Sequence, residues 1–224
     1  MYKKLPNGDF VPMDSGEVKS AVVLFSGGVE STATLEWASH QNYDVLLCVH
    51  SMWHDMEVSG SRELNPNVEK ICEYYNVPLY TYTHTDPLND FSYDGIQKIN
   101  YVHSSYHWLN TAMNIAARYP KMKEFLWGVN CGINKPGDGG DYHFLPRSWQ
   151  FAIAFDQYTN NMGRTEQQKL YPPVAHMTKK QMWESIPDEV KPLVQSCGDP
   201  LKYDGNSPCG KCYKCKEMAM IEGI

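Results

Sequence analysis

The chain has 224 residues, of which 42% are hydrophobic and 21% charged, and its formal net charge is −6. These values are typical of one globular domain with a full core, and the acidic balance argues against a protein that grips a nucleic-acid backbone. No apolar run approaches the ~20 residues that cross a bilayer, and no secretory signal is recognisable. We therefore expect a cytoplasmic protein with a small-molecule substrate, no direct nucleic-acid partner and no membrane association.

Short apolar runs alternate with longer helical patterns along the chain, an order typical of an α/β fold with a parallel sheet and helices on both faces. Pro172 and Pro173 limit the last run to an edge strand. Thr178 and Gln181 predict a capping box that opens a further helix. In chain order we predict strands at 20–25, 44–50, 77–83, 124–130 and 169–177 and helices at 31–41, 65–76, 104–119 and 147–158.

The first predicted strand ends in Ser26-Gly27-Gly28, and a helical pattern follows it. In an open α/β sheet this turn lies at the carboxyl edge, where ligands bind. Glycines let backbone N–H groups approach an anion, and the helix N-terminus adds positive potential. With the hydroxyls of Ser31 and Thr32 nearby, the pattern favours a phosphate site over the alternative, a tight turn with a serine N-cap.

Four of the seven cysteines lie in the last 28 residues with the spacing C-x11-C-x2-C-x2-C. This spacing predicts one structural Zn²⁺ held by four thiolates. An iron–sulfur cluster fits less well, because the ferredoxin run needs a fourth cysteine where Ala219 stands. The other cysteines, Cys48, Cys72 and Cys131, are expected to be buried. The predicted zinc ligands are Cys197, Cys209, Cys212 and Cys215.

The stretch "FSGGVES" resembles the PP-loop of the N-type ATP pyrophosphatases, Ser-Gly-Gly-x-Asp-Ser, with Glu30 in place of the aspartate. Together with the cysteine tail, it resembles the 7-cyano-7-deazaguanine synthase family from Val22 to Glu217. The resemblance implies a Rossmann-like, adenine nucleotide alpha hydrolase-like fold. It further implies that ATP adenylates 7-carboxy-7-deazaguanine, and that ammonia supplies the nitrogen of the final nitrile.

The resemblance also implies roles for individual residues. Glu30 is expected near the Mg²⁺ of ATP and Lys179 at a phosphate, although Lys179 as a solvated first-turn lysine is an equal alternative. The phosphate and adenine contacts are expected from Ser26, Gly27, Gly28, Val29, Ser31, Thr32, Val49, His50, Ser51 and Gly128. Asp141 and Arg147 are the expected substrate contacts, in a chain whose family often forms homodimers.

We expect residues 1–176 to form the ATP-binding domain, and residues 177–224 a helical and zinc-binding region packed on it. Two other functions stay open. One is a tRNA-modifying PP-loop enzyme, against which the net charge of −6 speaks. The other is a nucleotide-binding protein that has lost catalysis through the change to Glu30.

Overall fold

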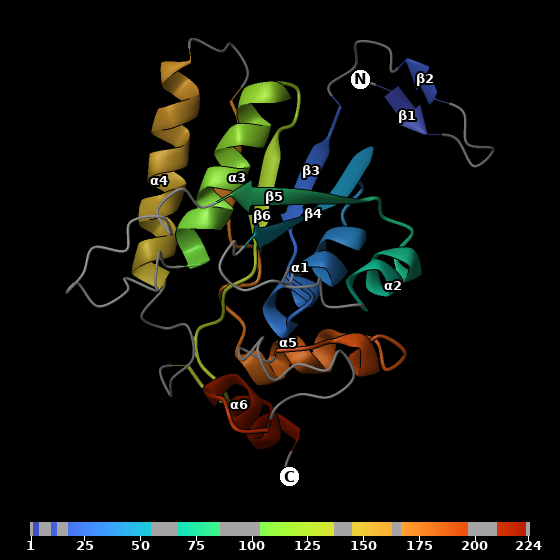
Figure 1. Cartoon of the computed structure of the whole chain (residues 1–224), viewed down its shortest axis with the longest axis vertical. Helices are drawn as coiled ribbons and strands as arrows, with labels where there is room; N and C mark the ends of the chain where they lie inside the picture. Colours follow the sequence, from blue (N-terminus) through green and yellow to red (C-terminus); the bar gives the residue numbers. More distant parts are fainter. Residues whose placement is uncertain are drawn as a thin grey trace.

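The computed structural model describes residues 2–4, 10–12, 18–54, 67–85, 104–136, 145–162, 167–196 and 210–222. Within them, strands β1 and β2 pair as a small antiparallel hairpin, and the remaining strands form one sheet (Figure 1). The strands are β1 (Tyr2–Lys4), β2 (Phe10–Pro12), β3 (Ser20–Leu24), β4 (Val45–His54), β5 (Leu79–Thr85), β6 (Glu124–Trp127) and β7 (Lys169–Tyr171). The helices are α1 (Val29–Ser39), α2 (Asn67–Tyr74), α3 (Ser104–Arg118), α4 (Leu145–Asn161), α5 (Lys179–Ser185), the 3-10 helix η3 (Lys191–Leu193) and α6 (Tyr213–Glu222).

The larger sheet has the order β5-β4-β3-β6-β7, and all of its strands are parallel. Counted along this sheet, the order is third, second, first, fourth, fifth, which is the arrangement of a Rossmann-like fold. The predicted α/β fold is therefore confirmed by the topology. Strand β7 lies at an edge, as its two following prolines require.

Two hydrophobic cores cover the two faces of the sheet. All five residues of β3 are buried, and their side chains alternate between the faces. Ala21 and Val23 belong to the core beneath α1, α2 and α5, whereas Val22 and Leu24 belong to the core beneath α3 and α4. In Figure 1, α3 and α4 lie together at the left, and α5 and α6 lie below α1.

Most predicted elements are present with shifted bounds. Helix α1 begins at Val29, two residues before the predicted start, and β4 continues four residues beyond its predicted end. Strand β6 ends at Trp127 and β7 at Tyr171, and Pro172 and Pro173 after β7 have no N–H to extend its ladder. The capping box of Thr178 and Gln181 is confirmed. The hairpin of β1 and β2 and helix α6 were not predicted.

The division of the chain at residue 176 stays a prediction, and α5, just beyond that point, packs against α1. Among the described residues, no helix combines the length and the apolar character needed to span a bilayer.

Candidate functional site

The candidate site lies where β3 and β6 end side by side. Leu24 is paired with Trp127 in the parallel register of these strands. The connection after β3 leads to β4 on one side, and the connection after β6 leads to β7 on the other, so this is the topological switch point of the sheet. Ligands of open α/β sheets bind in the crevice at such a point. The sequence Ser26-Gly27-Gly28 follows directly after β3.

The turn at 26–28 is held by its own serines. The Ser26 amide donates to Ser31 Oγ at 3.2 Å, the two hydroxyl oxygens lie 3.0 Å apart, and the Gly28 amide lies 3.4 Å from Ser26 Oγ. Gly27 has φ +75°, in the left-handed region that favours glycine. The N-cap of α1 is Gly28, which has no side chain, so the alternative of a serine N-cap is wrong. Ser26 is exposed, and Ser31 is buried behind it.

Some amides of this turn have no acceptor in the described part of the chain. Among the described residues, the amides of Gly27 and Ser31 donate to no protein acceptor. The Val29 amide donates to a distant hydroxyl, Ser196 Oγ, at 3.2 Å. Thr32 is fully buried, and its Oγ1 has no partner among the described residues. The turn is therefore a partly satisfied cluster of donors at a helix N-terminus, a geometry that suits an anion.

Gly128 brings the end of β6 into direct contact with the first turn of α1. A Cβ at this position would lie 2.4 Å from the Glu30 carbonyl carbon, 2.5 Å from its oxygen and 2.7 Å from the Ser31 amide nitrogen. Real Cβ atoms do not come so close to backbone, so this position requires glycine. The predicted cofactor residue Gly128 thus lies against the first turn of α1, and its role in the structure is to let two backbones touch.

Lys179, the first residue of α5, contacts Glu30 in the first turn of α1. Its side chain is 3% exposed, and its Nζ lies 2.8 Å from Glu30 Oε1 and 2.8 Å from Glu217 Oε2 of α6. The alternative of a solvated lysine is therefore wrong. Burial lowers the pKa of Lys179, but the two carboxylates raise it by more, so its net pKa lies above the ordinary value. Lys179 stays charged at neutral pH.

The carboxylate of Glu30 is held in place by two donors on one oxygen. Oε1 accepts from Lys179 and, at 3.0 Å, from Nδ2 of Asn130. The opposite end of the same amide, Asn130 Oδ1, accepts the Gly132 N–H at 3.0 Å. Burial raises the pKa of Glu30, but the charges of Lys179 and Lys214 lower it by more, so the net pKa lies below the ordinary value. Glu30 is therefore an ionised carboxylate with a fixed orientation.

His50 links β4 to the start of the turn. Its Nδ1–H donates to the Phe25 carbonyl at 2.7 Å, which leaves Nε2 as an acceptor. Burial lowers the pKa of His50 more than this hydrogen bond raises it, so the ring is neutral at pH 7. Val49 is buried and lines a cavity of about 250 Å³ between β4, β5 and α3. None of the residues of the turn lines that cavity.

Two of the four predicted zinc ligands lie in the described chain. Cys212 Sγ and Cys215 Sγ are 3.5 Å apart without a disulfide, and the Cys215 amide lies 3.5 Å from Cys212 Sγ. Sulfurs around tetrahedral zinc are about 3.8 Å apart, given Zn–S bonds of about 2.3 Å. The pair fits half of a zinc site. No group of three metal-binding side chains occurs among the described residues, and Cys197 and Cys209 lie outside them.

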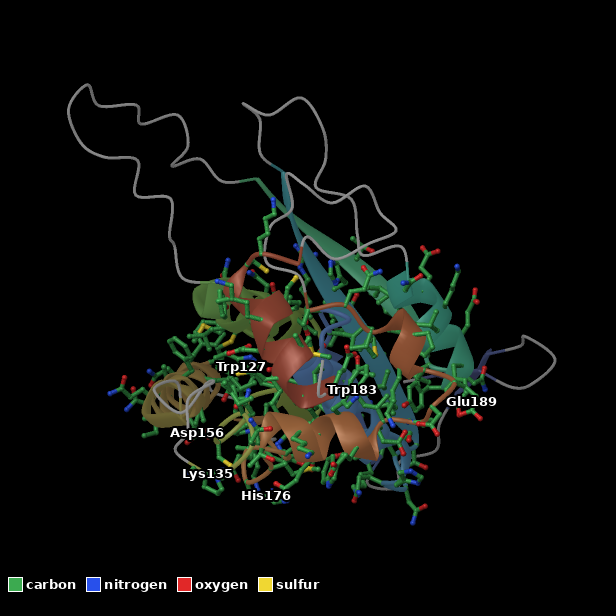
Figure 2. All side chains as sticks on the ribbon, turned by 90° about the horizontal axis from the view of Figure 1, so that it is seen from below. Trp127, Lys135, Asp156, His176, Trp183 and Glu189 are labelled. Carbon is green, nitrogen blue, oxygen red and sulfur yellow. The ribbon has the colours of Figure 1, made fainter. Side chains whose placement is uncertain are left out.

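Other predictions also lie outside the described residues or side chains. Asp141 is not described, and of Arg147 and Ser51 only the backbone is, in α4 and β4. The buried state predicted for Cys48, Cys72 and Cys131 is confirmed. Figure 2 views the molecule from below, with α5, which carries Trp183, and α6 across the near side.

Sequence reasoning missed three residues of this site: Asn130, Ser196 and Glu217. A signal existed for Asn130, because it is a polar residue two positions after Gly128, at the end of a buried strand. Ser196 reaches Val29 across 167 residues and Glu217 reaches Lys179 across 38. No local pattern marks such contacts, since they depend on how α5 and α6 pack.

Two solved structures resemble this chain in fold. NMN synthetase from Francisella tularensis aligns over 92% of this chain and 78% of its own, with 11% identity and a TM-score of 0.49. The U34-tRNA thiolase NcsA from Methanococcus maripaludis, with its 4Fe–4S cluster, aligns over 99% and 68%, with 13% identity and a TM-score of 0.40. No protein-family model and no curated protein matches the sequence. Likenesses at this level assign no reaction, so the site geometry has to carry the function.

Proposed function

We propose that this chain is an ATP-dependent enzyme that transfers AMP to a substrate oxygen and releases pyrophosphate. The observation that carries the proposal is the Ser26-Gly27-Gly28 turn at the switch point of the sheet. It joins the exposed Ser26 hydroxyl and the amides of Gly27 and Ser31 to the N-terminus of α1. Such donors stabilise the charge that develops on a departing pyrophosphate, because they are held in place before the reaction begins.

The residues around the turn have assigned places in this proposal. Lys179 remains a cation 2.8 Å from Glu30, close to where the phosphates would bind, and adds positive charge there. Glu30 offers a carboxylate for the Mg²⁺ that accompanies ATP, and a site of one carboxylate plus substrate phosphates suits this ion. Bound Mg²⁺ would neutralise phosphate charge. Asn130 fixes the orientation of Glu30, so the carboxylate needs no rearrangement when the nucleotide arrives.

We propose 7-carboxy-7-deazaguanine as the substrate, because the PP-loop and the cysteine tail occur together as in the family that the sequence resembles. A carboxylate is a poor electrophile, since its leaving group would be oxide. Adenylation forms an acyl–AMP bond and releases pyrophosphate, and ammonia then displaces AMP to give the amide. A second ATP adenylates the amide oxygen, and loss of AMP with two N–H protons gives the nitrile. The protein's task is to position reactants.

The decisive experiment is ATP–pyrophosphate exchange by the purified full-length protein. We expect exchange that 7-carboxy-7-deazaguanine stimulates, with the nitrile and AMP detected by mass spectrometry when ammonia is added. Stimulation by tRNA instead would favour a tRNA-modifying enzyme. Absence of exchange with either would contradict the proposal and favour a nucleotide-binding protein without catalysis.

A pair of variants at opposite ends of α1 tests the turn itself. Ser31→Ala removes a buried hydroxyl that bonds Ser26 and the Gly28 carbonyl, and we expect it to lower exchange by roughly tenfold, since leaving buried polar groups without their partner costs about 1–3 kcal/mol. Ser39→Ala removes an exposed hydroxyl that bonds only within the last turn, at Glu36, and should leave exchange unchanged. Equal rates in the two variants would speak against a phosphate site at this turn.

We further propose that Cys197, Cys209, Cys212 and Cys215 bind one structural Zn²⁺. The fit of Cys212 and Cys215 to a tetrahedral site supports it. Metal analysis of protein purified without added metal should give about one zinc per chain, and Cys215→Ser should lower both the zinc content and the melting temperature. Iron with a visible absorption band in its place would indicate a cluster and contradict the zinc assignment.

A further inference from the structure

The segment at 194–196, far from the turn in sequence, lies directly against it. The Gln195 amide donates to the Gly27 carbonyl at 3.0 Å, and Ser196 Oγ accepts from the Val29 amide at 3.2 Å. The open side of Gly28 faces the same segment, because a Cβ there would lie 3.4 Å from Ser196 Oγ and 3.7 Å from the Gln195 carbonyl oxygen. Residues 194–196 therefore form a wall beside Gly27, Gly28 and the N-terminus of α1.

The hydroxyl of Ser196 can extend the positive potential of the α1 N-terminus to a ligand. The Val29 N–H is one of the helix donors without a partner inside the helix. By accepting from it, Ser196 keeps its own O–H proton to donate to something else. Ser196 is only partly buried, and no described protein acceptor takes that proton. The next polar group of the segment, Gln195 Oε1, is buried without a partner among the described residues.

From this geometry, and on the basis of the proposed function, we propose that Ser196 is a binding residue of the phosphate site and donates its hydroxyl proton to a phosphate oxygen of ATP. Three hydroxyls then surround Gly28. Ser26 and Ser31 come from the turn, and Ser196 comes from the segment that leads to the cysteine tail. Ser196 thus provides a hydroxyl donor at a place where the turn by itself provides only the Val29 amide.

The proposal separates binding of phosphate from simple capping of α1. If Ser196 only caps the helix, Ser196→Ala would lower the melting temperature of the free protein and weaken AMP and longer nucleotides to the same degree. If it binds the phosphate chain, the variant would weaken a triphosphate more than AMP. The ratio of the two dissociation constants therefore reports the proposed role and is insensitive to a general loss of stability.

The experiment measures, by calorimetry with Mg²⁺, the dissociation constants of α,β-methylene-ATP and of AMP for the wild type, Ser196→Ala, Ser196→Thr and Ser39→Ala. We expect Ser196→Ala to weaken the triphosphate analogue by roughly tenfold or more and AMP by less than about twofold. Ser196→Thr, which keeps a hydroxyl, should recover most of the loss, and Ser39→Ala should behave as the wild type.

Two failures are distinguishable. A wild type that binds neither nucleotide overturns the proposed function and this inference with it. A wild type that binds the analogue, with Ser196→Ala binding it equally well or losing both nucleotides in equal proportion, leaves the proposed function standing and overturns the role of Ser196. If Ser196→Ala does not fold, Ser196→Thr and Ser196→Cys decide in its place: a thiol is a weaker donor, so Cys should bind the analogue less tightly than Thr.

Discussion

Replacing Gly128 by alanine is the sharpest steric test of the site. The new Cβ would lie 2.4 Å from the carbonyl carbon of Glu30, and all three of its nearest atoms are backbone. No side chain can rotate out of the way. An ordinary contact needs about 3.4 Å, so β6 and the first turn of α1 must separate by about 1 Å. We expect overpacking of this kind to lower the free energy of unfolding by about 2–3 kcal/mol.

The expected loss is measurable by two independent assays. For a chain of this size, about 2–3 kcal/mol corresponds to a fall in melting temperature of roughly 4–12 °C. The same 1 Å shift moves Glu30 and Ser31 away from β6, and a displacement of that size in an active site can lower a reaction rate by roughly a hundredfold. Urea unfolding measures the loss of unfolding free energy, and ATP–pyrophosphate exchange measures the loss of reaction rate.

Gly28→Ala is the matched control for the steric argument. Its Cβ would meet Ser196 Oγ at 3.4 Å, a tight contact with a movable side-chain atom, and Gly28 has φ −84°, which alanine adopts readily. We expect a loss below about 1 kcal/mol, as for alanine at an N-cap. The reasoning is refuted if Gly128→Ala unfolds within about 0.5 kcal/mol of the wild type, or if the two variants lose stability equally.

Three further predictions concern the charged cluster. Lys179→Met leaves two carboxylates without their cation and should lower the free energy of unfolding by about 3–5 kcal/mol in urea at pH 7. The control Lys180→Met, at the exposed neighbouring lysine, should change it by less than about 0.5 kcal/mol. Equal effects of the two variants would contradict a buried ion pair at Lys179. The difference between wild type and Lys179→Met should depend on pH. Folding depresses the pKa of Glu30, so its contribution is present above the ordinary value of 4.5 and is lost as the pH falls through the folded value. Folding raises the pKa of Lys179, so its contribution to stability is present below pH 10.5 and is lost as the pH rises through the folded value. If chemical unfolding showed the same difference between wild type and Lys179→Met at every pH from 3 to 12, both the Glu30 and the Lys179 predictions would be refuted. Finally, Asn130→Ala should lower the unfolding free energy by about 1–3 kcal/mol, because Glu30 loses a hydrogen-bond donor. Asn130→Asp should lower it by more, because it places a second carboxylate against Glu30. The reverse order in thermal unfolding would mean that Asn130 does not donate to Glu30.

The fold was predictable because its signals are local. A buried parallel strand reads as an unbroken apolar run, and β3 has every residue buried, so "SAVVL" is recognisable without neighbours. The capping box of Thr178 and Gln181 is likewise written in four consecutive residues. The hairpin of β1 and β2 was missed because each strand has three residues, too few to show a period of two.

The turn of the site was predictable because one segment carries it. Ser26, Gly27, Gly28 and Ser31 form a single turn, and the motif identifies them together. The ion pair of Glu30 with Lys179 was not predicted, because each residue was expected to face a ligand and nothing in either neighbourhood encodes the other. Lys179 also pairs with Glu217 of α6, which follows Cys215 by two residues.

The wall formed by Ser196 has a consequence for the timing of synthesis. The ribosome makes Val29 167 residues before the serine that accepts its amide proton. At about 5–20 residues per second, the nascent chain carries the glycine turn for roughly 8–30 s before that serine has been added. The nucleotide affinity that we propose for Ser196 can therefore arise only after residue 196 has been added, and shorter nascent chains lack it.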